Sequence, residues 1–118
     1  MPEGRWYMSM LLDFYGDLLT ERQRNCCDLH YNEDLSLSEI AEQCGISRQG
    51  VWDTIRHAED TLRETEEKTG LLQRFSETEE KLAKVLQDLE QLRTMTDGEA
   101  GELTERAVSE IRTLLQRG

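Results

Sequence analysis

The sequence predicts an all-α protein, with a helix-turn-helix domain of three or four helices followed by a C-terminal extension of one long helix or a helical hairpin. Apolar residues recur at three- and four-residue spacing along most of the chain, which is typical of helices with one buried face. Proline occurs once, at position 2, and charged residues make up 33% of the composition. Glycines fall between the periodic segments, where helices are expected to end.

Two helices are expected before the central motif. The first carries apolar residues from Met8 to Leu19 and ends near residues 16–19. Thr20 opens the second with a capping-box pattern, because Gln23 follows three positions later. The polar residues 32–34 then form a connection. Six of the seven aromatic residues lie in the first half of the chain, so the main core is expected there.

The central segment, from about Leu37 to Ala58, has the pattern of a helix-turn-helix. Ser36 and Glu39 form a second capping box before a short helix. Gly45 follows this helix and suits the left-handed conformation that ends many helices. Ser47 can cap the next helix, which has no breaker before Thr69. The expected apolar anchors of the two helices are Leu37, Ile40, Ala41, Cys44, Ile46, Val51, Ile55, Ala58 and Leu62.

Residues 1–70 are therefore expected to form the helix-turn-helix domain and residues 71–118 a helical extension. A heptad-like seam of Phe75, Leu82, Val85, Leu89 and Leu92 is followed by a predicted loop at residues 94–101. A last helix carries Leu103, Ala107, Ile111, Leu114 and Leu115. The two helices of the extension can pack on each other as an antiparallel hairpin. The alternative is a homodimer formed through the same apolar stripe.

Charge and composition argue against several functions. The net charge is −11 and no segment has a basic run, so strong non-specific binding to nucleic acid is not expected. The three cysteines have no zinc-ligand spacing and are expected to be reduced, and no metal or cofactor site is predicted. No apolar run reaches the roughly 20 residues of a membrane span. The sequence contains no Gly-rich phosphate loop or nucleophile elbow, so we expect no enzymatic activity.

The second helix of the motif supplies the candidate nucleic-acid-binding residues: Ser47, Arg48, Gln49, Trp52 and Arg56. In helix-turn-helix proteins that read DNA, the early exposed side chains of this helix meet base edges in the major groove. Arginine pairs with guanine and glutamine with adenine. The surrounding acidic residues oppose approach to a phosphate backbone. A motif kept as a scaffold or as a protein-docking surface is the other interpretation, and both remain open.

Four segments of the chain resemble the YlxM family of small bacterial helix-turn-helix proteins. They read LDFYGDLLTERQR (12–24), YNEDLSLSEIA (31–41), GISRQGV (45–51) and EEKTGLL (66–72), and the likeness extends over about residues 8–92. The chain departs from the family pattern at Gly50 and Trp52, where alanine and tyrosine are expected. Glycine at position 50 weakens the helix by roughly 1 kcal/mol relative to alanine.

The resemblance implies a domain similar to region 4 of sigma factors, which reads the promoter −35 element. It also implies a cytoplasmic protein associated with the signal recognition particle. The implied partners are the particle's GTPase or its RNA, with DNA as an additional possibility. The alternative function, which Ser47, Arg48 and Gln49 suggest, is that of a DNA-binding transcriptional regulator.

Overall fold

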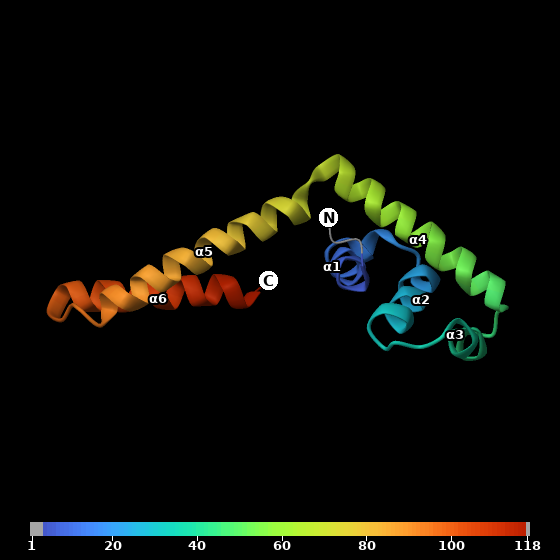
Figure 1. Ribbon diagram of the computed structural model, residues 1–118, viewed down its shortest axis with the longest axis horizontal. Coiled ribbons are helices and arrows are strands. Elements are labelled where there is room, and N and C mark those ends of the chain that lie inside the picture. The colour runs from blue at the N-terminus through green and yellow to red at the C-terminus, as the bar shows by residue number, and fades with distance from the viewer. Residues whose placement is uncertain (1–3, 118) are drawn as a thin grey trace. The chain divides into compact units, whose positions relative to one another are not determined.

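The computed structural model describes residues 4–117 of the chain, and these residues contain helices and no strands (Figure 1). The all-α fold class is therefore confirmed. The elements are α1 (Arg5–Tyr15), a short 3-10 helix η1 (Gly16–Leu18), α2 (Glu21–Tyr31), α3 (Leu37–Cys44), α4 (Arg48–Thr69), α5 (Leu71–Arg93) and α6 (Gly98–Arg117). The chain divides into two compact units, unit 1 (Met1–Leu72) and unit 2 (Gln73–Gly118), which are described separately.

The helix starts in unit 1 are set by side chains that cap the first turns. The Gln23 amide donates to Thr20 Oγ1 at 3.1 Å, and the Thr20 amide donates to Gln23 Oε1 at 3.0 Å. Ser36 and Glu39 make the same reciprocal pair at the start of α3. Both predicted capping boxes are present. Each satisfies backbone amides that have no partner within the helix.

The turn between α3 and α4 depends on Gly45, which has a φ of +69°. The amides of Gly45 and Ile46 both donate to the Ala41 carbonyl, at 2.9 and 3.2 Å. A residue with a Cβ is strained in this left-handed conformation, so glycine ends α3 at the lowest cost. Gly70 ends α4 in the same way, with a φ of +62°.

The core of unit 1 lies where α4 packs against α1, α2 and α3. Its fully buried side chains include Leu11, Ile40, Val51 and Leu62, one or more from each of three helices. The Tyr15 hydroxyl donates to Glu66 Oε1 at 2.6 Å and lies 2.6 Å from Thr69 Oγ1. Burial and the hydrogen bond to Glu66 raise the pKa of Tyr15. These contacts attach the end of α1 to the last turn of α4.

Unit 2 is an antiparallel hairpin of α5 and α6, two neighbouring helices in Figure 1. Arg93 forms ion pairs with Glu90 at 3.1 Å and with Glu105 at 3.0 Å. Arg112, about two turns further along α6, also reaches Glu90, as expected for antiparallel helices. Thr104 and Val108 are the buried side chains among the described residues of this unit.

Two details of the predicted extension are wrong. The loop is shorter than residues 94–101, because α6 begins at Gly98. Gly98 has a φ of +63°, and a Cβ on Gly101 would lie 3.3 Å from the Thr96 carbonyl oxygen. These glycines therefore serve the tight entry into α6 and do not extend the loop.

The predicted apolar stripes of the extension are also only partly those that pack in the hairpin. Val85 and Leu92 of the expected seam are 46% and 43% exposed. Leu103 and Leu114 of α6 are 59% and 52% exposed, whereas Val108, which the predicted stripe omitted, is buried. Each helix of the hairpin therefore leaves part of its apolar surface open.

Candidate nucleic-acid interface

The candidate interface is the first three turns of α4, which follow the helix-turn-helix turn directly. Ser47 is the N-cap of α4, and its Oγ accepts a hydrogen bond from the Gly50 amide at 2.9 Å. The amides of Arg48 and Gln49 lie in the first turn, where a helix has no internal acceptors for them. This end of α4 therefore offers backbone donors and a favourable dipole to an anionic group.

Gly50 lies close to the capping serine, which explains how the helix accommodates a glycine there. A Cβ at this position would meet Ser47 Oγ at 3.2 Å and Ile46 Cδ1 at 3.7 Å. The first distance is tighter than most van der Waals contacts of a Cβ. Glycine at position 50 therefore lowers the helix propensity of α4 but leaves room for the Ser47 cap.

Arg48, Trp52 and Arg56 lie along one side of α4, because residues four apart share a helix face. We call these three residues the Arg–Trp–Arg ridge. Trp52 is 45% exposed, and the guanidinium carbon of Arg56 lies 6.0 Å from the centroid of its ring. Both arginines are exposed. The ridge therefore presents an exposed aromatic ring with the Arg56 guanidinium over it and Arg48 one turn earlier on the helix.

Gln49 is positioned differently from the ridge. Its Nε2 donates to Asp53 Oδ1 at 3.0 Å, one turn further along α4. This hydrogen bond occupies one of the two groups that a glutamine needs for a bidentate contact with adenine. It also keeps a carboxylate beside the position where DNA would lie. The structure thus brings Arg48, Trp52 and Arg56 together and engages Gln49 and Ser47 within the protein.

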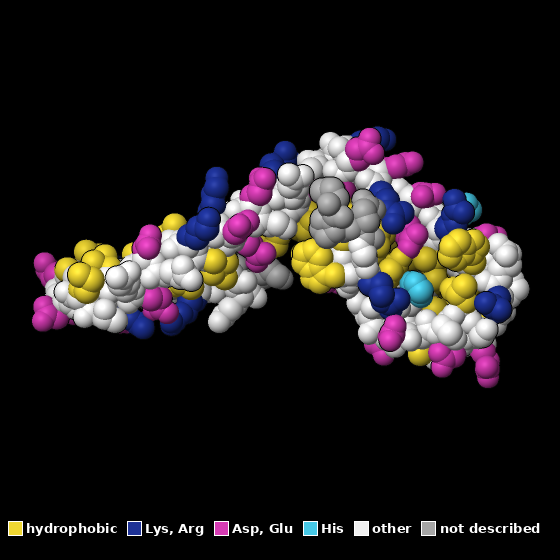
Figure 2. All heavy atoms as spheres, in the orientation of Figure 1, with side chains coloured by type: hydrophobic (Ala, Val, Ile, Leu, Met, Phe, Trp, Pro, Cys, Tyr) yellow, Lys and Arg dark blue, Asp and Glu magenta, His cyan; other side chains and the backbone are white. Residues whose placement is uncertain are grey.

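The surroundings of the ridge are acidic. Residues 1–72 contain 15 acidic and 7 basic side chains, a net charge of −8. Figure 2 shows Lys and Arg side chains interspersed with Asp and Glu side chains over the visible face of this unit. Several of the arginines are already paired, such as Arg5 with Asp34 and Arg24 with Asp17. A broad phosphate-binding surface is therefore not formed.

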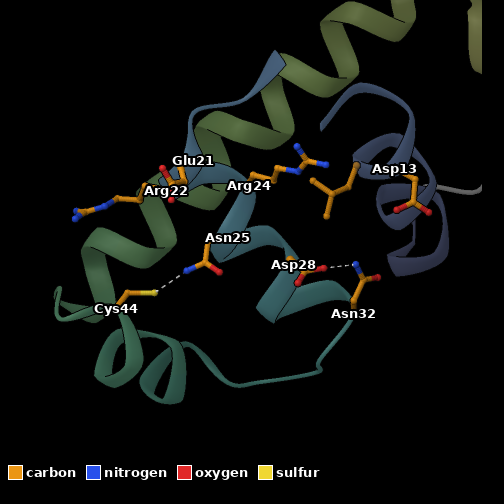
Figure 3. Close-up of a pocket in the computed structure, with 9 residues that line it drawn as sticks. Asp13, Glu21, Arg22, Arg24, Asn25, Asp28, Asn32 and Cys44 are labelled. Carbon is orange, nitrogen blue, oxygen red and sulfur yellow. Dashed lines mark hydrogen bonds between the residues drawn. The ribbon is translucent and has the colours of Figure 1, made fainter. Parts of the chain in front are cut away.

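A polar cavity of about 820 Å³, which the sequence did not predict, opens in unit 1 (Figure 3). Its lining comes from α1, α2 and the end of α3: Leu12, Asp13, Glu21, Arg22, Arg24, Asn25, Asp28, Asn32 and Cys44. Asn32 Nδ2 donates to Asp28 Oδ1 at 2.7 Å, and Asn25 Nδ2 contacts Cys44 Sγ at 3.7 Å. These side chains come from three helices, so no local motif could have predicted that they converge.

The cysteines do not form a metal site among the described residues, where no group of three or more suitable ligands is found. Cys26 and Cys27 are buried and Cys44 is partly buried. Burial is the main cause that raises the pKa of Cys26 to about 11 and that of Cys27 to about 12. Both side chains are thiols at neutral pH and pack in the core of unit 1. No helix in the described part of the chain is long and apolar enough to cross a membrane.

The chain matches one family of known proteins over most of its length. Residues 2–100 match the family model UPF0122, described as "Putative helix-turn-helix protein, YlxM / p13 like". A UPF0122 protein of Desulforamulus reducens is 44% identical over 110 residues, which cover 93% of this chain and 92% of the relative.

Two further relatives show how far the likeness extends. A UPF0122 protein of Thermoanaerobacter sp. strain X514 is 43% identical over 115 residues, 97% of this chain and 98% of the relative. This alignment continues beyond residues 8–92, where the recognisable motifs ended. One from Bacillus cereus strain AH187 is 50% identical over 87 residues, 74% of this chain and 79% of the relative. The chain belongs to the UPF0122 family of YlxM/p13-like helix-turn-helix proteins.

Proposed function

We propose that this protein is a non-enzymatic accessory protein of the signal recognition particle pathway, located in the cytoplasm, and that it binds the particle's RNA through the Arg–Trp–Arg ridge. The resemblance to YlxM proteins supports the pathway and the location. The observation that supports RNA is the exposed ring of Trp52 between Arg48 and Arg56. Unpaired bases in RNA loops and bulges stack on aromatic rings and on arginine planes.

The charge distribution favours a small contact over an extended one. Two arginines on the ridge can reach phosphates on either side of one stacked base, while the acidic surroundings repel a long backbone. Major-groove reading by Gln49 is disfavoured, because its side chain is hydrogen-bonded to Asp53. A short unpaired segment of a structured RNA fits these constraints better than a regular duplex.

The test compares binding of the particle's RNA, transcribed in vitro, to the full chain and to Trp52→Ala. Loss of one base–aromatic stack costs about 1–3 kcal/mol, which weakens binding roughly 5- to 150-fold. Trp52→Tyr keeps a ring and is expected to retain most of the affinity. Trp6→Ala is the matched control, because Trp6 is also exposed but lies on α1.

Equal affinity of the wild type and Trp52→Ala would contradict the role of the ridge. Binding of the purified GTPase subunit without any binding of the RNA would move the function to protein docking, which is the other partner implied by the resemblance. Binding of neither component would remove the pathway from the proposal.

A second candidate function is sequence-specific binding of duplex DNA. It is favoured by the geometry of the motif itself, in which Arg48 occupies the first position of the second helix, directly after the Ser47 cap. A gel shift against a library of DNA duplexes at fixed salt tests it with the double variant Arg48→Ala/Gln49→Ala. Selected duplexes that bind the double variant as well as the wild type would rule this function out.

A further inference from the structure

Unit 2 buries little apolar surface by itself. Its described residues include two buried side chains, Thr104 and Val108, although α5 and α6 are both longer than 19 residues. Two packed helices enclose a core on one side only, whereas stable helical bundles of this kind usually contain four. The hairpin therefore leaves exposed apolar side chains that a larger bundle would bury.

The exposed apolar side chains that α5 and α6 contribute to unit 2 lie on one side of the hairpin. On α6, Leu103 and Leu114 each directly precede a less exposed side chain, namely the buried Thr104 and the partly buried Leu115, on the side of α6 that faces α5. On α5, Val85 precedes the partly buried Leu86 in the same way. Each residue advances 100° around a helix, and α5 and α6 are antiparallel. On two antiparallel helices that face each other, the residues one position before the facing side chains point to the same side of the pair.

This side, which we call the hairpin face, consists of Val85, Leu92, Leu103 and Leu114, with exposed fractions of 43–59%. Figure 2 shows apolar side chains open to solvent along the hairpin. Exposed apolar groups that form a contiguous patch are typical of interaction surfaces. The two leucines of α6 are separated by about 16 Å along the helix, the rise between positions 103 and 114.

The charged residues beside this face have a two-fold pattern along α6. Arg106 and Glu110 lie between the two exposed leucines, and both pairs have their midpoint close to Val108. When two copies of α6 pack antiparallel with this midpoint shared, Leu103 of one copy faces Leu114 of the other. In the same arrangement Arg106 of each copy faces Glu110 of the other. The surface is thus complementary to itself in its apolar side chains and in its charges.

We propose that the hairpin face binds the hairpin face of a second copy of this chain, with α6 antiparallel to α6 about a two-fold axis near Val108. An isologous interface of this kind needs one self-complementary patch, and the pattern of α6 supplies it. In this arrangement the two α6 helices cover Leu103 and Leu114 of each other. The dimer is independent of what the Arg–Trp–Arg ridge binds.

Sedimentation velocity on the full chain, from about 1 to 100 µM, tests the dimer with the variants Arg106→Glu and Glu110→Arg. The wild type is expected to be a dimer at the upper end of this range. Each single variant places two like charges opposite each other on both sides of the axis, so each is expected to weaken dimerisation at least tenfold. A mixture of the two variants places opposite charges at both of these contacts in each mixed pair and is expected to restore a dimer that contains one chain of each.

Ser109→Arg is the matched control, because this exposed residue lies about 120° around α6 from Leu103, outside the hairpin face, and is expected to leave the dimer unchanged. Far-UV circular dichroism checks that every variant is folded. Restoration in the mixture supports the proposal, since a charge pair within one chain cannot produce it. A wild-type monomer at 100 µM would overturn the proposed dimer and would indicate that the hairpin face binds a different protein. A dimer that both single variants retain would overturn it as well.

Discussion

At the scale of single residues, His30 shows how a partly buried titratable group links stability to pH. Burial lowers its pKa, the nearby Arg5 lowers it further, and its Nδ1 is buried without a hydrogen-bond partner among the described residues. The folded state therefore favours the neutral imidazole. The unfolded chain takes up the proton first as the pH falls, so the fold loses stability below a pH of about 6.5.

The prediction is that His30→Leu flattens the decline in stability between pH 7 and pH 5. Urea unfolding at several pH values measures it, with His57→Leu as the control, because His57 is exposed on α4. Glu59 acts in the opposite direction, since burial raises its pKa and protonation then favours the fold. The informative quantity is therefore the difference between each variant and the wild type. An identical pH profile for wild type and His30→Leu would contradict the role of His30.

At the scale of elements, the first residues of α5 belong to unit 1, and the two leucines there have opposite environments. Leu72 is 4% exposed and belongs to the core of unit 1, whereas Leu71 is 44% exposed. The Leu72 amide also donates to Glu66 Oε1 at 3.0 Å, the same oxygen that accepts from Tyr15. One carboxylate thus connects α1, the end of α4 and the first turn of α5.

We expect Leu72→Ala to destabilise unit 1 by about 2–5 kcal/mol, because it leaves a cavity in a packed core. Leu71→Ala is the control at the adjacent position and is expected to change the free energy of unfolding by less than about 1 kcal/mol, since little area is removed from contact. Chemical denaturation followed by the tryptophan fluorescence of unit 1 measures both. Equal effects of the two substitutions would contradict the placement of the start of α5.

Elements that depend on neighbouring residues were predicted from the sequence, and those that depend on distant contacts were not. The caps at Thr20 and Ser36 and the turn at Gly45 were predicted correctly, because each depends on a few residues close in the chain. The sequence did not predict that Val108 is buried and Leu103 exposed. Both residues lie on plausible apolar faces of α6, and the position of α5 decides which face is buried. At the candidate interface, the sequence pointed to Gln49 but could not show that its side chain is hydrogen-bonded one turn further along α4.

At the scale of the whole molecule, the acidic net charge of −11 limits how any nucleic acid can bind. Only Arg48 and Arg56 of the ridge are placed to neutralise phosphates in the proposed complex. The logarithm of the association constant with RNA is therefore expected to fall with the logarithm of salt concentration with a slope between about −1 and −2. Titrations at several potassium chloride concentrations measure the slope. A value of about −5 or steeper would contradict the ridge as the main contact and indicate a broad basic surface.

The environments of the three cysteines have a practical consequence for labelling. Cys26 and Cys27 are buried thiols whose raised pKa values leave almost no reactive thiolate at neutral pH. Cys44 is the partly accessible one, at the last position of α3 and next to Gly45. A maleimide dye or spin label is therefore expected to attach to the wild-type chain at Cys44 first, one residue from the turn. A label on Cys44 of the native sequence can therefore report changes at the turn of the helix-turn-helix when a ligand binds.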